Sequence, residues 1–414
     1  MDYSAIKQAM GKGDELFFRC PNASIETILT SNDIDDAYRR LLRFASYVQT
    51  AFPKTCETKG IIDSPLQEVA SMKSALEKNY GITIPGKLFV KRDDSLAVCG
   101  SLKARGGIYT VFKHAEALAK SAGLLSDDDD YAKLDTDRMQ KFFSGYKISV
   151  GSTGNLGMSI GLSGKKLGFD VTVYMSEEAK QWKKDTLRKA GAKVVEFEGD
   201  YTSALKVARC EASKDANNFF IDDEDSKDLF LGYSAVSRTL PGQLKDKGIK
   251  VDKEHPLVVW LPCGVGGGPG GITFGLKDVF GENVYCFFGE PTQMPCMALA
   301  MAEQRSNVSI YDINLSGKTI ADGLACSSPS PIAYEVIKGI LDGCFTVTDD
   351  NTLELTKLLY ATENIKAELS SCLSFGGLGR ITFDIPNIEN STNIVWLTGG
   401  SLVPDDEWER LGII

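Results

Sequence analysis

The chain has 414 residues, of which 43% are hydrophobic and 25% are charged, and its formal net charge is −10 at pH 7. This length can bury a large core in two or more lobes, and an acidic chain without a basic stripe is not typical of a nucleic-acid binder. No apolar run approaches the length of a membrane span, and the first residues lack the layout of a signal peptide. With ten cysteines and no short Cys-x-x-Cys pair, we expect a cytoplasmic protein with reduced thiols.

The predicted elements describe an α/β protein. Apolar residues at helical spacing predict a helix over 34–47, and an extended turn at 61–66 precedes a helix that ends near residue 79. The acidic run 126–130 is interpreted as a solvated insertion. Predicted strands are 87–91, 147–150, 171–174, 193–197, 219–221, 257–261, 284–288 and 393–397. Predicted helices are 108–122, 156–167, 177–189, 202–213, 273–280, 334–341 and 353–362, with a further helical segment after residue 374.

Alternating strands and helices favour a doubly wound arrangement. We expect two open, twisted, mostly parallel sheets flanked by helices, with a ligand between the two lobes. In this scheme residues 1–95 and 218–414 form a large cofactor-binding domain, and residues 96–217 form a small α/β domain.

Lys103 is the first candidate for chemistry. It lies in Gly100–Gly107, between a predicted strand and a predicted helix, where a half-buried lysine can lose its proton and form an imine. Only two histidines are present, His114 and His255, which disfavours a histidine triad or a zinc site. Acid–base work is therefore expected from lysine, carboxylates, hydroxyls or a cofactor.

Two small-residue loops follow predicted strands. Gly151–Gly157 contains hydroxyls and the amide of Asn155 at a helix start, where it can hold an anion or act as an ordinary capped turn. In Cys263–Gly271 six of nine residues are glycine, which suits a backbone nest for phosphate. The second loop matches neither a Walker loop nor a clean dinucleotide fingerprint.

Two further residues end strands. Thr398 follows the last predicted strand, so its hydroxyl is expected to face the cleft. Glu290 ends the strand before it and is either a cation ligand or a surface residue.

A lysine for an imine, a glycine nest for a phosphate, an asparagine for a ring hydroxyl and a threonine for a ring nitrogen together describe pyridoxal phosphate. At these positions the sequence resembles the fold type II pyridoxal-phosphate lyases. The lysine motif and the long glycine loop are specific, whereas the loop around Asn155 identifies only the broader fold type. The stretches that carry the resemblance lie between about residue 60 and the C-terminus: 100–109, 150–157, 219–224, 229–234, 261–271, 321–325 and 396–400.

The resemblance implies a role for each matching residue. Lys103 would form the imine and move the Cα proton, Asn155 would bond the ring hydroxyl, and Thr398 would bond the ring nitrogen. The backbone N–H groups that would hold the cofactor phosphate belong to Gly264, Val265, Gly266, Gly267 and Gly268.

The resemblance also implies substrate and cation ligands. Ser152 and Thr153 would face the substrate carboxylate, and Asp223 would lie near the substrate hydroxyl. Glu290 would contribute to a monovalent-cation site for K⁺ or Na⁺.

The implied reaction is the β-elimination of D-serine to pyruvate and ammonia, and a lyase for L-serine or L-threonine is the alternative enzyme. The expected partner is a small amino-acid substrate, with no nucleic acid and no membrane, and the oligomeric state stays open. A binding protein with a degenerate fold is the alternative from another class, against which Lys103, Asn155 and Thr398 argue. A third alternative is a nucleotide-binding protein built on the glycine loop. It is disfavoured, because the sequence has no acidic residue for the ribose at the expected distance.

Overall fold

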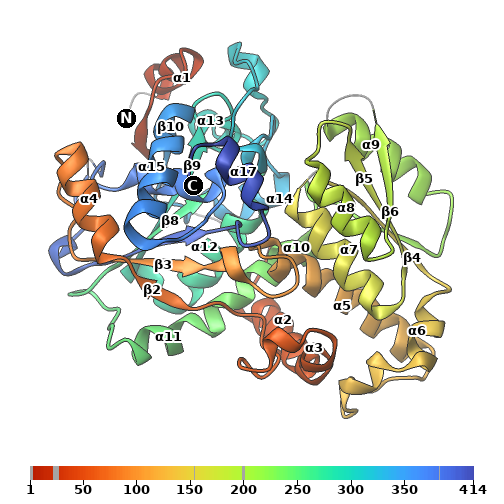
Figure 1. Ribbon diagram of the computed structural model, residues 1–414. Coiled ribbons are helices and arrows are strands. Elements are labelled where there is room, and N and C mark those ends of the chain that lie inside the picture. The colour runs from red at the N-terminus through yellow and green to blue at the C-terminus, as the bar shows by residue number, and fades with distance from the viewer. Residues whose placement is uncertain (1–2, 22–27, 153, 198–200, 382) are drawn as a thin grey trace. The chain divides into compact units, whose positions relative to one another are not determined.

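The computed structural model describes residues 3–21, 28–152, 154–197, 201–381 and 383–414 (Figure 1). The chain forms two compact units. The first contains Met1–Ser31, Ser64–Ser95 and Tyr233–Ile414, and the second contains Asn32–Asp63 and Leu96–Gly232. The domain limits predicted from the sequence differ from these units in residues 32–63 and 218–232, and they remain a prediction about domains.

The first unit is built on a seven-stranded mixed sheet. Its inner strands run parallel, and the two edge strands pair antiparallel with their neighbours. Strands β8 and β11 are buried along their whole length, as expected for parallel strands that are covered on both faces. The order across the sheet is β1 (Phe17–Arg19), β10 (Gly343–Val347), β9 (Val284–Pro291), β8 (Leu257–Pro262), β11 (Thr392–Leu397), β3 (Lys87–Arg92) and β2 (Leu66–Glu68).

Helices and 3-10 turns cover this sheet, with α12 packed against α14, and α15 packed against α4 and η8. The α-helices are α1 (Tyr3–Gly11), α4 (Ala70–Tyr80), α11 (Leu240–Asp246), α12 (Gly267–Phe280), α13 (Cys296–Glu303), α14 (Pro331–Ile337), α15 (Asp349–Glu363), α16 (Leu369–Cys372) and α17 (Asp405–Arg410). The 3-10 turns are η2 (Asp93–Ser95), η4 (Ala235–Arg238), η5 (Gly281–Asn283), η6 (Ile310–Ile313), η7 (Asp322–Leu324), η8 (Leu373–Gly377) and η9 (Ile388–Asn390).

The second unit contains a four-stranded parallel sheet in the order β6 (Lys193–Phe197), β5 (Asp170–Ser176), β4 (Lys147–Gly151) and β7 (Asn218–Ile221). Helices α7 and α8 pack side by side, and α9 packs on β4, β5 and β7 (Figure 1). Its helices are α2 (Ser31–Arg43), α3 (Ala45–Ala51), η1 (Pro53–Thr55), α5 (Lys103–Ser121), η3 (Tyr131–Asp135), α6 (Asp137–Phe143), α7 (Asn155–Leu167), α8 (Gln181–Lys189), α9 (Tyr201–Ala212) and α10 (Lys227–Ser234), of which α2 and α10 reach the unit boundary.

Each sheet has a point at which the chain reverses its direction across the strands. In the first unit the chain runs β8, β9, β10 and then returns past β8 to form β11. In the second it runs β4, β5, β6 and then returns past β4 to form β7. Right-handed crossovers in opposite directions place their helices on opposite faces, so the carboxyl ends of β8 with β11, and of β4 with β7, are the expected ligand sites within their own sheets.

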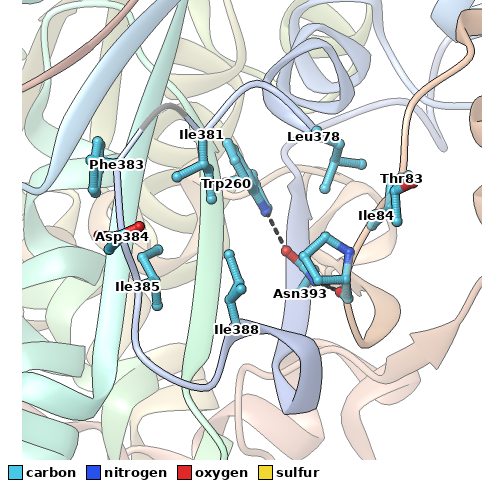
Figure 2. Close-up of a pocket in the computed structure, with 12 residues that line it drawn as sticks. Thr83, Ile84, Trp260, Leu378, Ile381, Phe383, Asp384, Ile385, Ile388 and Asn393 are labelled. Atoms are coloured by element: carbon cyan, nitrogen blue, oxygen red, sulfur yellow. Dashed lines mark hydrogen bonds between the residues drawn. The ribbon is translucent and has the colours of Figure 1, made fainter.

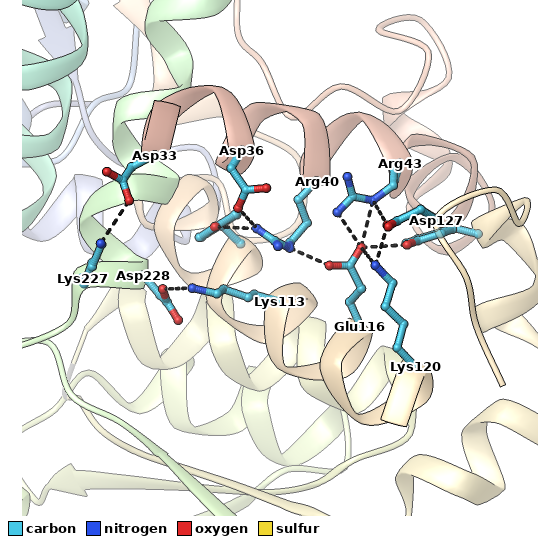
Figure 3. A network of polar contacts seen from close by, with 12 residues as sticks. Asp33, Asp36, Arg40, Arg43, Lys113, Glu116, Lys120, Asp127, Lys227 and Asp228 are labelled. Carbon is cyan, nitrogen blue, oxygen red and sulfur yellow. Dashed lines mark hydrogen bonds and ion pairs between the residues drawn. The ribbon is translucent and has the colours of Figure 1, made fainter. Parts of the chain in front are cut away.

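A buried carboxylate ties α2 to α5 in the second unit (Figure 3). Arg40 donates from Nε to Glu116 Oε2 at 2.7 Å, Arg43 donates from Nε to Oε1 at 2.9 Å, and the Tyr131 hydroxyl donates to Oε1 at 2.7 Å. Burial alone would raise the pKa of Glu116, but these bonds outweigh it and lower the pKa to about 2. Glu116 is therefore a charged, fully partnered group at 3% exposure.

The predicted fold class is confirmed, and most predicted strands are present with small shifts at their ends. The prediction that the helix after the second glycine loop begins at Thr273 is wrong, because α12 already begins at Gly267. Glycine disfavours a helix, yet Pro269 suits a first helical turn, and every residue from Gly268 to Leu276 is buried. The predicted start of a helix at Glu177 is also wrong, since α8 begins at Gln181. Among the described residues, no helix has the length and apolar character needed to cross a membrane.

Candidate active site

Lys103 is the first residue of α5 in the second unit. The loop before it is tight: Val98 has a φ of 82°, a conformation that β-branched residues rarely adopt, and Ser101 Oγ accepts the N–H of Lys103 at 3.2 Å. Helix α5 approaches α7 closely, because a Cβ at Gly107 would lie 2.4 Å from Ser159 Oγ. The Lys103 side chain is 25% exposed, so it is half-buried at this corner.

Asp223 lies beside the amine of Lys103. Nζ is 3.3 Å from Oδ2 and 3.4 Å from Oδ1. The acids on either side turn away, because Arg209 of α9 donates to Asp222 Oδ2 at 2.8 Å and to Glu224 Oε2 at 3.2 Å. Arg209 therefore holds the two flanking carboxylates and leaves the middle one facing the lysine. Sequence reasoning missed Arg209, which carries no motif and lies in a separate helix.

Ser152 follows β4, and Asp223 follows the neighbouring parallel strand β7, so both lie at the carboxyl edge of the four-stranded sheet. Its Oγ accepts the N–H of Gly154 at 3.3 Å and the N–H of Gly157 at 3.1 Å, which caps the first turn of α7. With both lone pairs used, the hydroxyl can still donate its proton to an anion at the positive helix end. Asn155 begins α7 and is half-buried. Thr153 lies outside the described residues.

The glycine loop lies in the first unit between β8 and α12. Gly266 has a φ of 103°, and a Cβ there would lie 2.3 Å from Met297 Cε, so this position requires glycine. A Cβ at Gly267 would meet no described atom within 4 Å. Open space therefore adjoins the first turn of a 14-residue helix, whose initial N–H groups have no intrahelical acceptor. This cradle fits a phosphate group.

Two thiols fix the start of this loop. Cys263 Sγ donates to the Gly264 carbonyl at 3.3 Å, and Cys296 Sγ donates to the same carbonyl at 3.4 Å. Burial raises the pKa of Cys296 well above its usual range, so its thiol stays a neutral donor. Because a trans peptide is planar, the next N–H, that of Val265, points opposite to this carbonyl. The thiols thus set the direction of one amide of the loop.

Thr398 follows β11, which pairs directly with β8, so it lies at the same sheet edge as the glycine loop. It is half-buried, and its Oγ1 lies 3.1 Å from Ser371 Oγ. Ser371 also accepts the N–H of Thr398 at 2.8 Å. Sequence reasoning missed Ser371, because nothing local marks a serine that lies 27 positions away in α16.

Glu290 is fully buried at the end of β9. Its Oε1 accepts the N–H of Met297 at 2.8 Å and its Oε2 accepts the N–H of Ala298 at 2.7 Å, so it caps the start of α13. Burial raises the pKa of Glu290 to about 8, against the effect of these bonds. Among the described residues, no group of three or more His, Cys, Asp or Glu side chains is arranged to hold a metal ion.

A pocket of about 260 Å³ lies in the first unit, at the opposite, amino-terminal side of the sheet (Figure 2). Two of its polar side chains bond within the protein: Trp260 Nε1 donates to Asn393 Oδ1 at 3.1 Å, and Asn393 donates to the Pro85 carbonyl at 2.7 Å. None of the predicted site residues lines it. The lining residues are Thr83, Ile84, Pro85, Trp260, Leu378, Gly379, Ile381, Phe383, Asp384, Ile385, Ile388 and Asn393.

Comparisons with known proteins identify the family of the chain. Residues 58–399 match a family described as pyridoxal-phosphate dependent enzyme. A probable D-serine dehydratase from Bacillus cereus is 47% identical over 409 residues, which is 95% of this chain and 92% of that protein. A probable D-serine dehydratase from Geobacillus stearothermophilus is 45% identical over 427 residues, which is 99% of this chain and 93% of that protein.

A crystal structure of diaminopropionate ammonia lyase from Escherichia coli in complex with D-serine has the same fold. Its TM-score is 0.71 at 16% sequence identity, and the match covers 96% of this chain and 97% of that chain. The family match includes Lys103, both small-residue loops and Thr398. The chain therefore belongs to the pyridoxal-phosphate dependent enzymes, with the fold type II architecture.

Proposed function

We propose that this protein is a D-serine dehydratase, which removes water from D-serine to give aminoacrylate, whose hydrolysis takes up water again and yields pyruvate and ammonia. The observation that carries the proposal is the 45 to 47% identity, over nearly the whole of both chains, to probable D-serine dehydratases. A related fold that binds D-serine in the Escherichia coli lyase supports a D-amino acid as the ligand class.

The residues present fit pyridoxal phosphate. Lys103 would hold it covalently through Nζ, the N–H groups of Gly264–Gly268 would hold its phosphate, Asn155 would bond its ring hydroxyl, and Thr398 would bond its ring nitrogen. The cofactor, when bound, withdraws electrons from the substrate and so weakens the Cα–H bond. A neutral hydroxyl at Thr398, in place of a carboxylate, gives the ring nitrogen no adjacent negative charge and so favours prompt elimination.

The chain's own groups would handle the substrate. Lys103 Nζ takes the proton from Cα, a role for which a half-buried lysine is suited. Asp223 accepts a hydrogen bond from that amine at 3.3 Å and so orients it. It would also lie near the substrate hydroxyl. Ser152 donates its hydroxyl proton to the substrate carboxylate, together with Thr153. Holding these groups in place before substrate arrives lowers the entropic cost of the reaction.

We also propose that Glu290 contributes to a monovalent-cation site for K⁺ or Na⁺. A buried carboxyl whose pKa is raised by burial would gain from a neighbouring positive charge. The proposed location is the cytoplasm, because none of the ten cysteines forms a disulfide in the described structure.

The test is the release of 2-oxo acid by the purified protein from D-serine, L-serine and L-threonine, each measured with saturating pyridoxal phosphate. We expect turnover of D-serine to exceed that of both L-amino acids by at least tenfold, which corresponds to about 1.4 kcal/mol in the barrier. The Lys103→Ala variant controls for contaminating lyases. Faster release from L-serine or L-threonine would replace this proposal with a lyase for L-amino acids.

A further inference from the structure

The hydroxyl of Ser371 lies at the centre of the turn that follows β11. Its Oγ accepts two backbone N–H groups, from Thr398 at 2.8 Å and from Gly399 at 3.0 Å. It also lies 3.1 Å from Thr398 Oγ1 and 3.2 Å from the Gly399 carbonyl oxygen. Ser371 is fully buried, so these protein groups replace water around it.

A count of protons and lone pairs decides the direction of these bonds. A serine hydroxyl has one proton and two lone pairs. The two N–H groups occupy both lone pairs, so Ser371 Oγ has none left to accept a proton from Thr398. The Ser371 proton must instead go outward, to Thr398 Oγ1 or to the Gly399 carbonyl, which are the two acceptors within reach.

The consequence falls on Thr398. Its hydroxyl proton cannot turn back to Ser371, the partner it contacts in the described part of the chain, so it must point to another acceptor. A bond received from Ser371 would also strengthen Thr398 as a donor, because hydrogen bonds in a chain polarise one another. A half-buried hydroxyl whose proton is directed away from Ser371 can donate it to a neutral ring nitrogen.

We propose that Ser371 is a positioning residue. It prevents the Thr398 hydroxyl from donating its proton to Ser371, so that this hydroxyl donates to the ring nitrogen of the cofactor. This inference rests on the proposed function, in which Thr398 is the ring-nitrogen partner. Ser371 itself touches neither cofactor nor substrate and acts only through Thr398.

The test is the ¹⁵N chemical shift of pyridoxal phosphate labelled at the ring nitrogen and bound to the holoenzyme. Thr398→Val should move this resonance toward that of a nitrogen without a hydrogen bond, and Ser371→Ala should move it in the same direction. Cofactor affinity should fall about threefold to tenfold in Ser371→Ala, as expected for the loss of one hydrogen bond. The double variant should show the shift of Thr398→Val alone, because Ser371 acts through Thr398.

Ser374→Ala is the matched control. Ser374 is a fully buried serine in the adjoining η8, and its Oγ has no hydrogen-bond partner among the described residues. Its variant should leave the resonance unchanged. A resonance unmoved in Thr398→Val would refute the role of Thr398 in the proposed function. A resonance that moves in Thr398→Val but not in Ser371→Ala would refute the present inference alone.

Neutron diffraction from deuterated crystals of the wild-type holoenzyme gives a readout that does not depend on a folded variant. The inference requires the Ser371 deuteron to point at Thr398 Oγ1 or at the Gly399 carbonyl, and the Thr398 deuteron to point away from Ser371. A Thr398 deuteron directed at Ser371 Oγ would overturn it, whatever the variants do.

Discussion

The carboxylate of Glu116 should make the second unit sensitive to acid, and Glu116→Gln tests this. The pKa of Glu116 is lowered to about 2 by its bonds to Tyr131, Arg40 and Arg43, against a value of about 4.3 in an unfolded chain. A difference of roughly 2.3 pKa units corresponds to about 3 kcal/mol of stability. Leaving both arginines without this carboxylate adds to the loss, so we expect about 3 to 5 kcal/mol at pH 7.

The sign of the pH dependence follows from the lowered pKa. Between about pH 4.3 and pH 2 the unfolded chain binds a proton at this residue and the folded chain does not, so the contribution is complete above this window and disappears as the pH falls through it. The stability difference between wild type and Glu116→Gln should therefore be large at pH 7 and shrink toward pH 2.

The assay is hydrogen exchange of peptides from α5 in increasing urea at pH 7 and pH 3. Exchange in α5 reports on the second unit, whereas a whole-protein signal would mix two units that need not unfold together. Asp127→Asn is the control, since Asp127 is a solvent-exposed partner of the same network and its loss should be small at either pH. An equal gap at both pH values, or a gap below about 1 kcal/mol at pH 7, would refute the reasoning.

Three further outcomes are expected. Lys103→Ala should abolish the absorbance of the cofactor imine and nearly all turnover, and turnover at the wild-type rate would exclude Lys103. Gly266→Ala should weaken both folding and cofactor binding, because its Cβ would meet Met297 Cε, whereas Gly267→Ala should fold like wild type but bind cofactor more weakly. Titration with cofactor and thermal unfolding distinguish these two effects. Unchanged cofactor affinity in Gly267→Ala would place the phosphate elsewhere. Burial lowers the pKa of His114 to about 4 from an ordinary value of 6.5, so stability should fall as the pH drops from 6.5 to 4, and His114→Phe should lack this slope in pH-dependent unfolding.

The sequence predicts the ends of the strands better than it predicts the side-chain partners of the site residues that follow those strands. Runs such as Leu257–Leu261 are apolar enough to be buried on both faces, and the small or polar residues after them are available for ligands at the sheet edge. The start of α12 was missed because local propensity opposes a glycine-rich helix, whereas tertiary packing decides it. The partners of the site residues were missed for a different reason: a contact such as that between Arg209 and Asp222 joins separate elements and leaves no pattern along the chain.

These partners show how the candidate residues are prepared before any ligand binds. Arg209 holds the acids that flank Asp223, Cys296 fixes a carbonyl of the glycine loop, and Ser371 orders the turn at Thr398. Each partner belongs to the same unit as the group it orients, so each unit fixes its own share of the chemistry through its own packing. A substitution at a partner should therefore change the orientation of its group while the fold of the other unit is kept. Variants of this kind separate the positioning of chemical groups from their identity, which removal of Lys103 or Thr398 alone cannot do.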